Sequence, residues 1–340
     1  MQEKPIAVVT GGAGFIGSHM TDRLLQEGYK VRVVDNLTGG RLSNLEHQAG
    51  NADLVVEECD IRSLTPDSTI FDNVRHVYHF AGIGDIVPSI EQPIEYMSTN
   101  VMGTVRVLEA ARHGGQSSLQ RFVYAASSSC YGLADTPTRE DHPIQPQYPY
   151  ALSKYQGEQA VLHWGKVYDL PVNSMRIFNA YGPRVRTTGA YGAVFGVFFR
   201  QKLAGKPYTV VGDGTQTRDF VYVTDVADAF FLAANGAYPG NIYNIGADNP
   251  QSVLHLVALL GGDVARGDVV FIPKRPGEPD CTWANAEKIT RELGWKPRVD
   301  FATGVKIMLQ DIENWRDAPL WDTQSIAEAT ATWFKYMGKQ

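Results

Sequence analysis

The sequence contains few cysteines and no evident set of metal ligands. Its 340 residues include three cysteines, Cys59, Cys130 and Cys281, which occur singly. Such spacing supplies neither a disulfide framework nor a CxxC metal site, and it suits a reducing compartment. Metal-ligand spacing is also absent among His19, His79, His113 and His163. We therefore expect no metal.

The chain also lacks an excess of positive charge and any long hydrophobic run. The 31 basic and 37 acidic side chains give a formal charge of −6, which leaves no electrostatic footprint for nucleic acid. No segment approaches the roughly 18 apolar residues of a membrane-spanning helix, and the first residues do not resemble an export signal. We expect a cytoplasmic protein that binds neither nucleic acid nor a membrane.

A glycine-rich turn between a strand and a helix dominates the first 40 residues. Residues 6–10 have the apolar, β-branched pattern of a buried parallel strand, and a helical pattern runs from residue 15 to about 28. Such a turn lets the backbone approach a pyrophosphate, and the helix N-terminus supplies free N–H groups. The pattern predicts a dinucleotide site with contacts from Gly11, Gly14, Phe15, Ile16 and Gly17.

An acidic residue at the end of the next strand indicates which dinucleotide binds. Asp35 lies 18 residues beyond Gly17, and a carboxylate there binds a ribose 2′-hydroxyl and repels a 2′-phosphate. Asn36 follows it, and Arg41 is near enough in sequence to keep NADP open. A loop cap is the alternative role for Asp35. We expect NAD.

Strand and helix patterns alternate as far as residue 178. Strands are expected at 53–57, 74–80, 122–126 and 172–178, with helices at 93–113 and 150–168. This order implies an α/β fold with a doubly wound parallel Rossmann sheet, whose ligands lie beyond the C-terminal strand ends. Residues 1–178 therefore form the expected NAD-binding domain. The further cofactor contacts expected there are Asp60, Ile61, Phe80, Ala81, Gly82 and Asn100, although a surface turn is an equal alternative for the first two.

After about residue 180 the alternation weakens. Glycine, proline, arginine and aromatic residues concentrate in loops at 181–191, 212–219 and 273–280. Long loops of this kind are more often functional than passive connections. We expect residues 179–340 to form mainly a smaller mixed α/β substrate-binding lobe, with segments near 220–250 returning to the first domain. The elements expected here are strands at 208–211 and 241–245, and helices at 224–234 and near 252–260, 285–293 and 302–315.

Tyr150 is the only one of 16 tyrosines that is followed four residues later by a lysine, Lys154. This spacing puts both side chains on one helix face. An ammonium and a cationic nicotinamide lower the pKa of a tyrosine, which can then exchange a proton with a substrate hydroxyl. One such YxxxK pair is expected by chance in a chain of this length, and a tyrosine packed on Pro149 at a helix start is the alternative.

Three serines follow the strand expected at 122–126. Ser127, Ser128 and Ser129 would lie at its C-terminal end, where this architecture places its chemistry. A hydroxyl there can orient a reacting oxygen without acting as a nucleophile. No GxSxG motif surrounds the serines, which argues against a hydrolase. By itself the run could be a polar turn.

In combination these motifs resemble the extended short-chain dehydrogenase/reductase family, and within it the nucleotide-sugar epimerases and dehydratases. The resemblance extends in order from residue 6 to about 297. It is carried by residues 10–17 (TGGAGFIG), 35–37 (DNL), 60–61 (DI), 127–132 (SSSCYG), 150–154 (YALSK), 179–184 (NAYGPR), 212–214 (GDG), 218–225 (RDFVYVTD) and 275–278 (RPGE). It implies that Tyr150 is the acid/base, that Lys154 supports it and the nicotinamide ribose, and that Ser127 holds the sugar hydroxyl.

The resemblance also implies a site for a nucleoside diphosphate. Its expected ligands are Asn179, Arg218, Arg275 and Glu278, and an arginine fork suits a diphosphate. A salt bridge to Asp219 or Asp225 is the alternative role for Arg218, and a pair with Arg275 is the alternative for Glu278. The other expected substrate contacts are Ser128, Ser129, Arg186, Tyr208 and Thr282.

The serine run bears on which reaction is expected. In related dehydratases an Asp-Glu pair follows the active-site hydroxyl residue, and decarboxylases usually carry a Glu where Ser129 stands. We therefore expect a UDP-sugar 4-epimerase that regenerates NAD, with a 4,6-dehydratase, a decarboxylase or a non-catalytic NAD-binding regulator as alternatives.

The resemblance leaves the sugar open. Thr282 hints at room for N-acetylglucosamine, and Arg186 matches a carboxylate clamp for glucuronate, while glucose also stays open. The apolar helices at 94–113 and 150–168 suggest a homodimer, and analogy suggests a role in surface polysaccharide biosynthesis.

Overall fold

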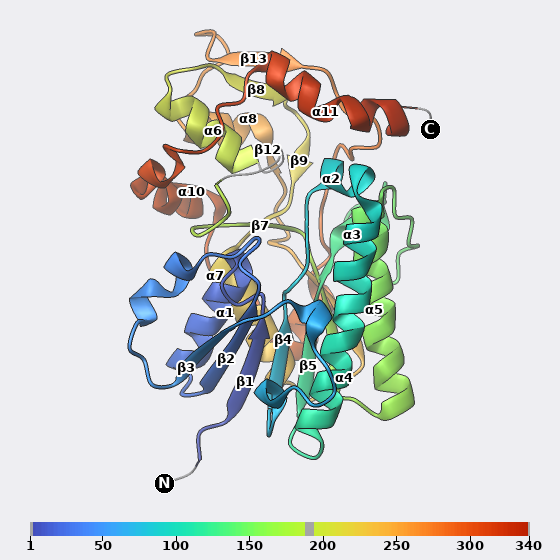
Figure 1. Ribbon diagram of the computed structural model, residues 1–340. Helices are drawn as coiled ribbons and strands as arrows, with labels where there is room; N and C mark the ends of the chain where they lie inside the picture. Colours follow the sequence, from blue (N-terminus) through green and yellow to red (C-terminus); the bar gives the residue numbers. More distant parts are fainter. Residues whose placement is uncertain (1–2, 188–193, 339–340) are drawn as a thin grey trace.

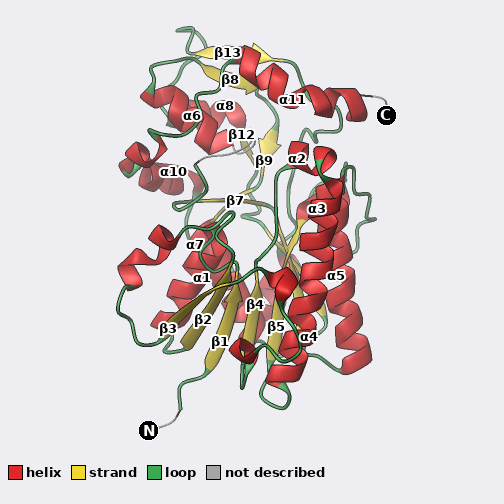
Figure 2. Cartoon of the chain, viewed as in Figure 1, coloured by secondary structure: helices red, strands yellow, loops and turns green. Residues whose placement is uncertain are grey.

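Seven parallel strands form the central sheet of the computed structural model, which describes residues 3–187 and 194–338 (Figures 1 and 2). Their order is β11-β6-β5-β4-β1-β2-β3, and every pairing between neighbours is parallel. The strands are β1 (Ile6–Thr10), β2 (Lys30–Asp35), β3 (Leu54–Glu58), β4 (His76–His79), β5 (Arg121–Ser127), β6 (Val172–Ile177) and β11 (Asn241–Ile245). This topology confirms the expected doubly wound Rossmann sheet.

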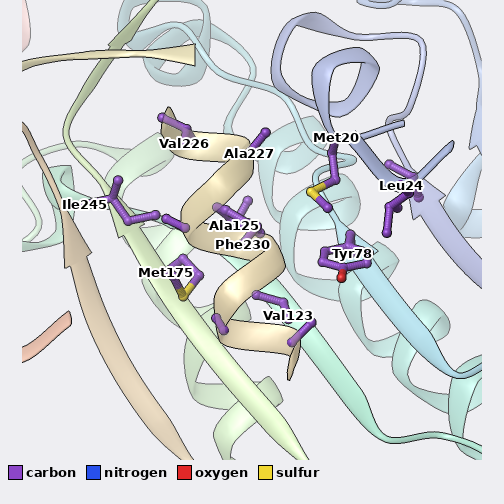
Figure 3. Packing of buried hydrophobic residues seen from close by; sticks show 14 of the residues in the cluster. Met20, Leu24, Tyr78, Val123, Ala125, Met175, Val226, Ala227, Phe230 and Ile245 are labelled. Carbon is purple, nitrogen blue, oxygen red and sulfur yellow. The ribbon is translucent and has the colours of Figure 1, made fainter. Parts of the chain in front are cut away.

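Helices cover both faces of this sheet. On one face α1 (Phe15–Gln26) packs beside α7 (Val223–Asn235). Figure 3 shows Val226, Ala227 and Phe230 of α7 against buried side chains of the strands. The other face carries α3 (Pro93–Met97), α4 (Thr104–Gly115) and α5 (Pro149–Tyr168). Since α7 and β11 belong to this layer, residues between 220 and 250 do return to the sheet.

The helix expected at 93–113 is not continuous. A π-helical segment, η4 (Ser98–Gly103), separates α3 from α4. Such an insertion widens one turn and is frequent at functional sites. The short helical turns elsewhere are η1 (Leu42–Gln48), η2 (Ile61–Ser63), η3 (Thr69–Phe71), η5 (Ser128–Tyr131) and η6 (Ile312–Trp315).

A smaller lobe lies beyond the C-terminal ends of the strands (Figure 1). Its aromatic core stacks Tyr181 on Phe195 and Phe220 on Phe301. The pairs of short strands are β7 (Asn179–Tyr181) with β10 (Phe220–Tyr222), β9 (Thr217–Arg218) with β12 (Gln251–Ser252), and β8 (Tyr208–Val211) with β13 (Val269–Ile272). The other helices of the described chain, in both lobes, are α2 (Ile86–Glu91), α6 (Val194–Leu203), α8 (Val253–Leu259), α9 (Glu287–Leu293), α10 (Phe301–Gln310) and α11 (Thr323–Met337). Of these, α2 packs on α5 and α9 packs on β11.

The loop expected at 181–191 lies within the described residues only as far as residue 187. Across ranges 3–187 and 194–338, no helix combines the length and the apolar character needed to cross a bilayer.

Candidate active site

The glycine-rich turn is packed so closely that two of its positions admit no side chain. A Cβ on Gly17 would lie 2.1 Å from the Gly11 carbonyl oxygen, and one on Gly11 would lie 2.7 Å from the Ala81 nitrogen. Gly11 also has a φ of 70°, which favours glycine. Gly14 is the N-cap of α1, and no side-chain hydrogen bond caps the helix there. This geometry fits a pyrophosphate bound by backbone N–H groups.

Asp35 ties this turn to the loop that follows β2. Its carboxylate accepts hydrogen bonds from the backbone N–H groups of Ala13 at 3.0 Å and Leu37 at 2.8 Å, and burial raises the pKa of Asp35. The Arg41 guanidinium instead donates to the Val185 carbonyl at 3.1 Å. The Arg41 guanidinium thus bonds the loop after β7 rather than the Asp35 carboxylate.

The second expected cofactor segment forms a capped turn. Asp60 accepts hydrogen bonds from Asn36 at 3.1 Å and from the Arg62 side chain at 2.7 Å. The Arg62 guanidinium lowers the pKa of Asp60 to about 2. Ile61 is buried. The structure thus joins Asn36 to Asp60 at the strand ends, as a cofactor site requires, and also shows the turn that was the alternative.

Asn100 connects the π-helical segment to the loop after β4. Its side-chain amide pairs with both backbone groups of Ile83, at 2.8 and 3.0 Å, and donates to Ser153 at 2.9 Å. A Cβ on Gly82 would lie 2.9 Å from the Asn100 oxygen and 3.8 Å from Nζ of Lys154. Asn100 therefore holds the expected 80–82 segment close to Lys154. Phe80 itself packs on Phe230, with ring centroids 4.5 Å apart.

Ser127 ends β5, and Tyr150 and Lys154 lie one turn apart near the start of α5. Ser127 lowers the pKa of Tyr150 through its side chain, and the Lys154 ammonium lies 4.4 Å from the centroid of the Tyr124 ring. In the protein by itself burial raises the pKa of Tyr150, because desolvation outweighs the opposing effect of Ser127. The lowered pKa expected for Tyr150 beside a bound nicotinamide stays a prediction. Burial also lowers the pKa of Lys154 to about 7, with Glu158 opposing that shift.

The serine run belongs to a larger group of hydroxyls. Ser127 Oγ lies 2.8 Å from Ser129 Oγ and accepts a hydrogen bond from the Ser129 N–H at 3.2 Å. The Tyr148 ring stacks on that of Tyr150 with an interplanar angle of 7°. Ser128 is half-buried in η5. Tyr148 thus packs beside the expected acid/base although no spacing rule marks it in the sequence.

The expected diphosphate ligands form a compact ionic cluster. Arg218 donates to Glu278 at 2.8 Å, and Arg275 approaches the other oxygen of the same carboxylate at 3.3 Å. The alternative given for Glu278, a pair with Arg275, is therefore formed, whereas Arg218 pairs with Glu278 rather than with Asp219 or Asp225. Two guanidinium groups share one carboxylate, so the cluster has surplus positive charge. Such a cluster fits a diphosphate.

Asn179 and Thr282 are joined beside this cluster. Thr282 donates to the Asn179 side-chain oxygen at 2.8 Å and accepts from the Asp219 N–H at 3.2 Å. Asp219 itself is fully buried and accepts backbone hydrogen bonds that include those from Ala247 and Ala284. Burial raises the pKa of Asp219 to about 6. It is a structural carboxylate that the sequence did not single out.

Comparison with known proteins gives this geometry a family. The family model for GDP-mannose 4,6 dehydratase matches residues 8–308. The chain belongs to this family. UDP-glucose 4-epimerase from Mycolicibacterium smegmatis is 34% identical over 316 residues, covering 90% of this chain and 98% of that protein. UDP-glucuronic acid decarboxylase 1 from Danio rerio is 31% identical over 310 residues, covering 89% of this chain and 71% of that protein.

A solved structure agrees over the same length. UDP-glucuronic acid 4-epimerase from Bacillus cereus, in complex with UDP-glucuronic acid and NAD, has a TM-score of 0.83. It is 30% identical, and the match covers 91% of this chain and 99% of that chain. The resemblance to extended short-chain dehydrogenases/reductases that act on nucleotide sugars is confirmed.

In this family member, two expected substrate residues have different surroundings. Arg186 pairs with Asp85 at 2.9 Å, and the Asp85 charge contributes to raising the pKa of Tyr150. Arg186 therefore reaches the edge of the catalytic group. Tyr208 is buried in the core of the smaller lobe, where its hydroxyl donates to the Leu260 carbonyl at 3.3 Å. The structure does not bring the Tyr208 side chain together with the other site residues.

Proposed function

We propose that the protein is an NAD-dependent 4-epimerase of a UDP-sugar. The observation that carries the proposal is the placement of Ser127 at the end of β5, where it lowers the pKa of Tyr150, with Lys154 one turn beyond Tyr150 on α5. The site has hydroxyls rather than carboxylates at positions 128 and 129. An epimerase needs one proton-transfer group and a reversible oxidant at C4. The other reactions of related enzymes need more acid/base groups.

The chain's own residues have distinct tasks in this reaction. Tyr150 accepts the proton of the C4 hydroxyl, and Ser127 donates a hydrogen bond to the same oxygen as charge develops on it. Lys154 supplies a positive charge next to the phenol while it is protonated. NAD, when bound, supplies the reversible hydride acceptor. The glycine turn and Asp35 would hold the pyrophosphate and the adenosine ribose.

The hydroxyl at Ser129 separates this proposal from its main competitors. Elimination or decarboxylation needs a group that carries a proton at a second carbon or assists loss of the leaving group. A serine hydroxyl has no accessible charged form near neutral pH, whereas a carboxylate has. Relatives that include decarboxylases keep those reactions as the second candidate.

The ionic cluster supports a substrate that carries a nucleoside diphosphate, which the cluster would bind. Arg218 and Arg275 present guanidinium groups at one place, and Glu278 can accept hydrogen bonds from a ribose. For the sugar itself, Arg186 already pairs with a carboxylate, that of Asp85. Since a substrate carboxylate can take the same place, Arg186 favours UDP-glucuronate over UDP-glucose and UDP-N-acetylglucosamine.

We further propose that the protein works as a homodimer. Ile94 of α3, Met102 of η4 and Leu152 of α5 are 83%, 55% and 38% exposed, although they belong to neighbouring elements. Apolar surface of this kind supports a helical interface between two copies. Light scattering after gel filtration should give twice the monomer mass, and Met102→Glu should shift it toward the monomer. A wild-type monomer at micromolar concentration contradicts this part of the proposal.

Product analysis tests the reaction. Purified protein is incubated with NAD and, in turn, UDP-glucose, UDP-N-acetylglucosamine and UDP-glucuronate, and the products are resolved by chromatography and NMR. The proposal predicts interconversion of C4 epimers for at least one substrate, fastest for UDP-glucuronate. A stable 4-keto-6-deoxy product or a pentose would assign the second candidate instead.

A further inference from the structure

A buried histidine at the end of β4 links three segments at the C-terminal edge of the sheet. His79 is fully buried, and its ring nitrogens Nδ1 and Nε2 lie 2.6 Å from the Thr10 hydroxyl and 2.9 Å from the Thr104 hydroxyl. Thr10 ends β1 beside the glycine turn, and Thr104 begins α4 directly after the π-helical segment. The proposed reaction gives this histidine no task.

The positions of the protons in this network follow from the acceptor at one end. The Thr104 hydroxyl donates to the Asn100 carbonyl at 2.7 Å, and this direction is fixed because a carbonyl carries no proton. Thr104 must then accept from His79, so Nε2 of His79 carries a proton. Burial, with the Lys154 charge acting in the same direction, lowers the pKa of His79 to about 3. The ring is therefore neutral, and its Nδ1 is an acceptor.

The other end of the network reaches the loop after β4. Because Nδ1 is an acceptor, the Thr10 hydroxyl donates to it, and the same oxygen accepts the Ala81 N–H at 3.3 Å. Thr10 and His79 are partners in the register of β1 and β4, so this contact joins neighbouring strands. Ala81 lies against the glycine turn, since a Cβ on Gly11 would be 2.7 Å from the Ala81 nitrogen. The network thus sets the spacing of two segments expected to contact NAD.

Asn100 extends the network to a third segment. Its backbone carbonyl is the terminal acceptor, and its side-chain amide pairs with both backbone groups of Ile83, at 2.8 and 3.0 Å. One residue therefore connects His79 to the loop that follows Gly82. A Cβ on Gly82 would lie 3.8 Å from Nζ of Lys154, so this loop borders the buried ammonium.

We propose that His79 is a positioning residue for NAD, which holds the glycine turn, the 80–82 segment and the π-helical segment in the relative positions that bind the dinucleotide. Only the neutral Nε2–H form of the ring suits this role, because it donates to Thr104 and accepts from Thr10. The other tautomer would set a lone pair of Nε2 against the Thr104 oxygen, and a charged ring would repel Lys154. The inference rests on the expected NAD contacts and goes beyond the proposed reaction.

The test is His79→Phe, which keeps a buried ring of similar size and removes both hydrogen bonds. We expect the Kd for NAD to rise about 10-fold, as for loss of one or two buried hydrogen bonds. The Kd for UDP, which the ionic cluster of the smaller lobe would bind, should not change. Calorimetry with NAD-free protein measures both constants.

The matched control is His76→Phe. His76 is a buried histidine at the N-terminal end of the same strand, and its Nδ1 lies 3.2 Å from the Tyr29 hydroxyl. The same substitution there also removes a buried hydrogen bond, but at the end of β4 that is remote from the glycine turn. It should lower the melting temperature and leave the Kd for NAD unchanged.

Variants of Thr104 test the network without changing the histidine. Thr104→Val keeps the shape of the side chain and removes its hydroxyl, so it should weaken NAD binding as His79→Phe does. Thr104→Ser keeps the hydroxyl and should retain the affinity of the wild-type protein. Combining Thr104→Val with His79→Phe should add little, because both break one network. A merely structural role would lower the melting temperature in these variants without moving the Kd for NAD.

Nitrogen NMR of the protein without ligands tests the tautomer directly. The His79 signals, assigned by their absence in His79→Phe, should show a protonated Nε2 and an unprotonated Nδ1. Since the pKa of His79 is about 3, they should not titrate between about pH 5 and about pH 8. A protonated Nδ1 anywhere in this range overturns the assigned form of the ring.

The binding outcomes separate this inference from the proposed function. An unchanged Kd for NAD in both His79→Phe and Thr104→Val, or an equal rise in His76→Phe, overturns the role of His79. A wild-type protein that interconverts no UDP-sugar but shows the expected differences in NAD affinity rejects the proposed reaction and keeps this inference. If His79→Phe does not fold, Thr104→Val and Thr104→Ser carry the test.

Discussion

Burial of Lys154 disfavours the positive charge of its ammonium group. The side chain is 7% exposed, and burial lowers its pKa from 10.5 to about 7. Between those two values the unfolded chain binds a proton that the folded chain does not. The contribution of this site to stability therefore rises with pH across that window, and the full cost of burying the ammonium is felt below it. The charge that the proposed function assigns to Lys154 is thus kept at the expense of stability.

Replacement of this lysine should separate activity from stability. Lys154→Met is expected to raise the melting temperature, most strongly at about pH 6 and less at about pH 9, because the buried ammonium is removed. Turnover should fall by about 100-fold or more. Thermal denaturation and steady-state kinetics check this. Lys166→Met on the exposed side of α5 is the matched control and should change neither quantity. A destabilised Lys154→Met protein at pH 6 would count against the assigned cost.

Residue pairs within one segment were predictable, whereas those made by tertiary contact were not. The spacing of Tyr150 and Lys154 and the position of Asp35 follow from helix and strand periods. The packing of the Tyr148 ring against Trp333 depends on how α5 and α11 meet. Asp219 likewise shows its role only through the backbone groups that surround it. The direction of the Tyr150 pKa shift depends on burial, which sequence does not give.

At the scale of elements, α11 stands out because it lies beyond the family match at residues 8–308. Its Trp333 donates to the Pro276 carbonyl at 2.8 Å and lies under the Arg275 guanidinium, 5.3 Å from the ring centroid. It also packs against α2 through Val87. The helix therefore links the loop of the ionic cluster to the catalytic side of the molecule.

Removal of this ring should weaken substrate binding more than chemistry. Trp333→Ala is expected to raise KM for the UDP-sugar about 10-fold, since Arg275 loses a cation–π contact and its loop loses a hydrogen bond. Tyr336→Ala, on the exposed side of the same helix, is the control. Steady-state kinetics with the best substrate measure both. An unchanged KM in Trp333→Ala would show that α11 does not position Arg275.

The sequence patterns gave the central elements more reliably than the peripheral ones. The strands expected at 53–57 and 122–126 differ from β3 and β5 by one residue at each end. The match is close because short apolar runs are typical of a parallel sheet. The expected helix at 93–113 contains a π-helical insertion that no periodicity reveals. The missed helix α11 did carry signals, namely a capping box at Asp322 and buried residues at helical spacing.

For the whole molecule, function depends on two lobes that meet over the C-terminal strand ends. The sheet supplies the glycine turn and Asp35, and the smaller lobe supplies Arg218 and Arg275. Element order predicts that ligands bind at this edge, because parallel sheets bind ligands at the C-terminal ends of their strands. Which loops of the smaller lobe reach the sheet was not predictable, since it depends on long-range packing.

The preference for NAD over NADP should depend on residues at the C-terminal ends of the strands. NAD should raise the melting temperature by mass action, whereas NADP at the same concentration should have little effect. The reason is that the Asp35 carboxylate repels a 2′-phosphate while Arg41 is bonded to the Val185 carbonyl. Thermal shift titrations with both dinucleotides measure this. Equal stabilisation by both would contradict the assigned role of Asp35.

The central claim is that one phenol moves the proton of the reacting sugar hydroxyl. Its most direct test is the turnover of Tyr150→Phe with the preferred UDP-sugar, with binding of NAD and nucleotide measured by calorimetry in the same preparation. We predict unchanged binding and a fall in kcat of about 100- to 10,000-fold, the usual contribution of general acid/base catalysis. Turnover near the wild-type rate would contradict the account.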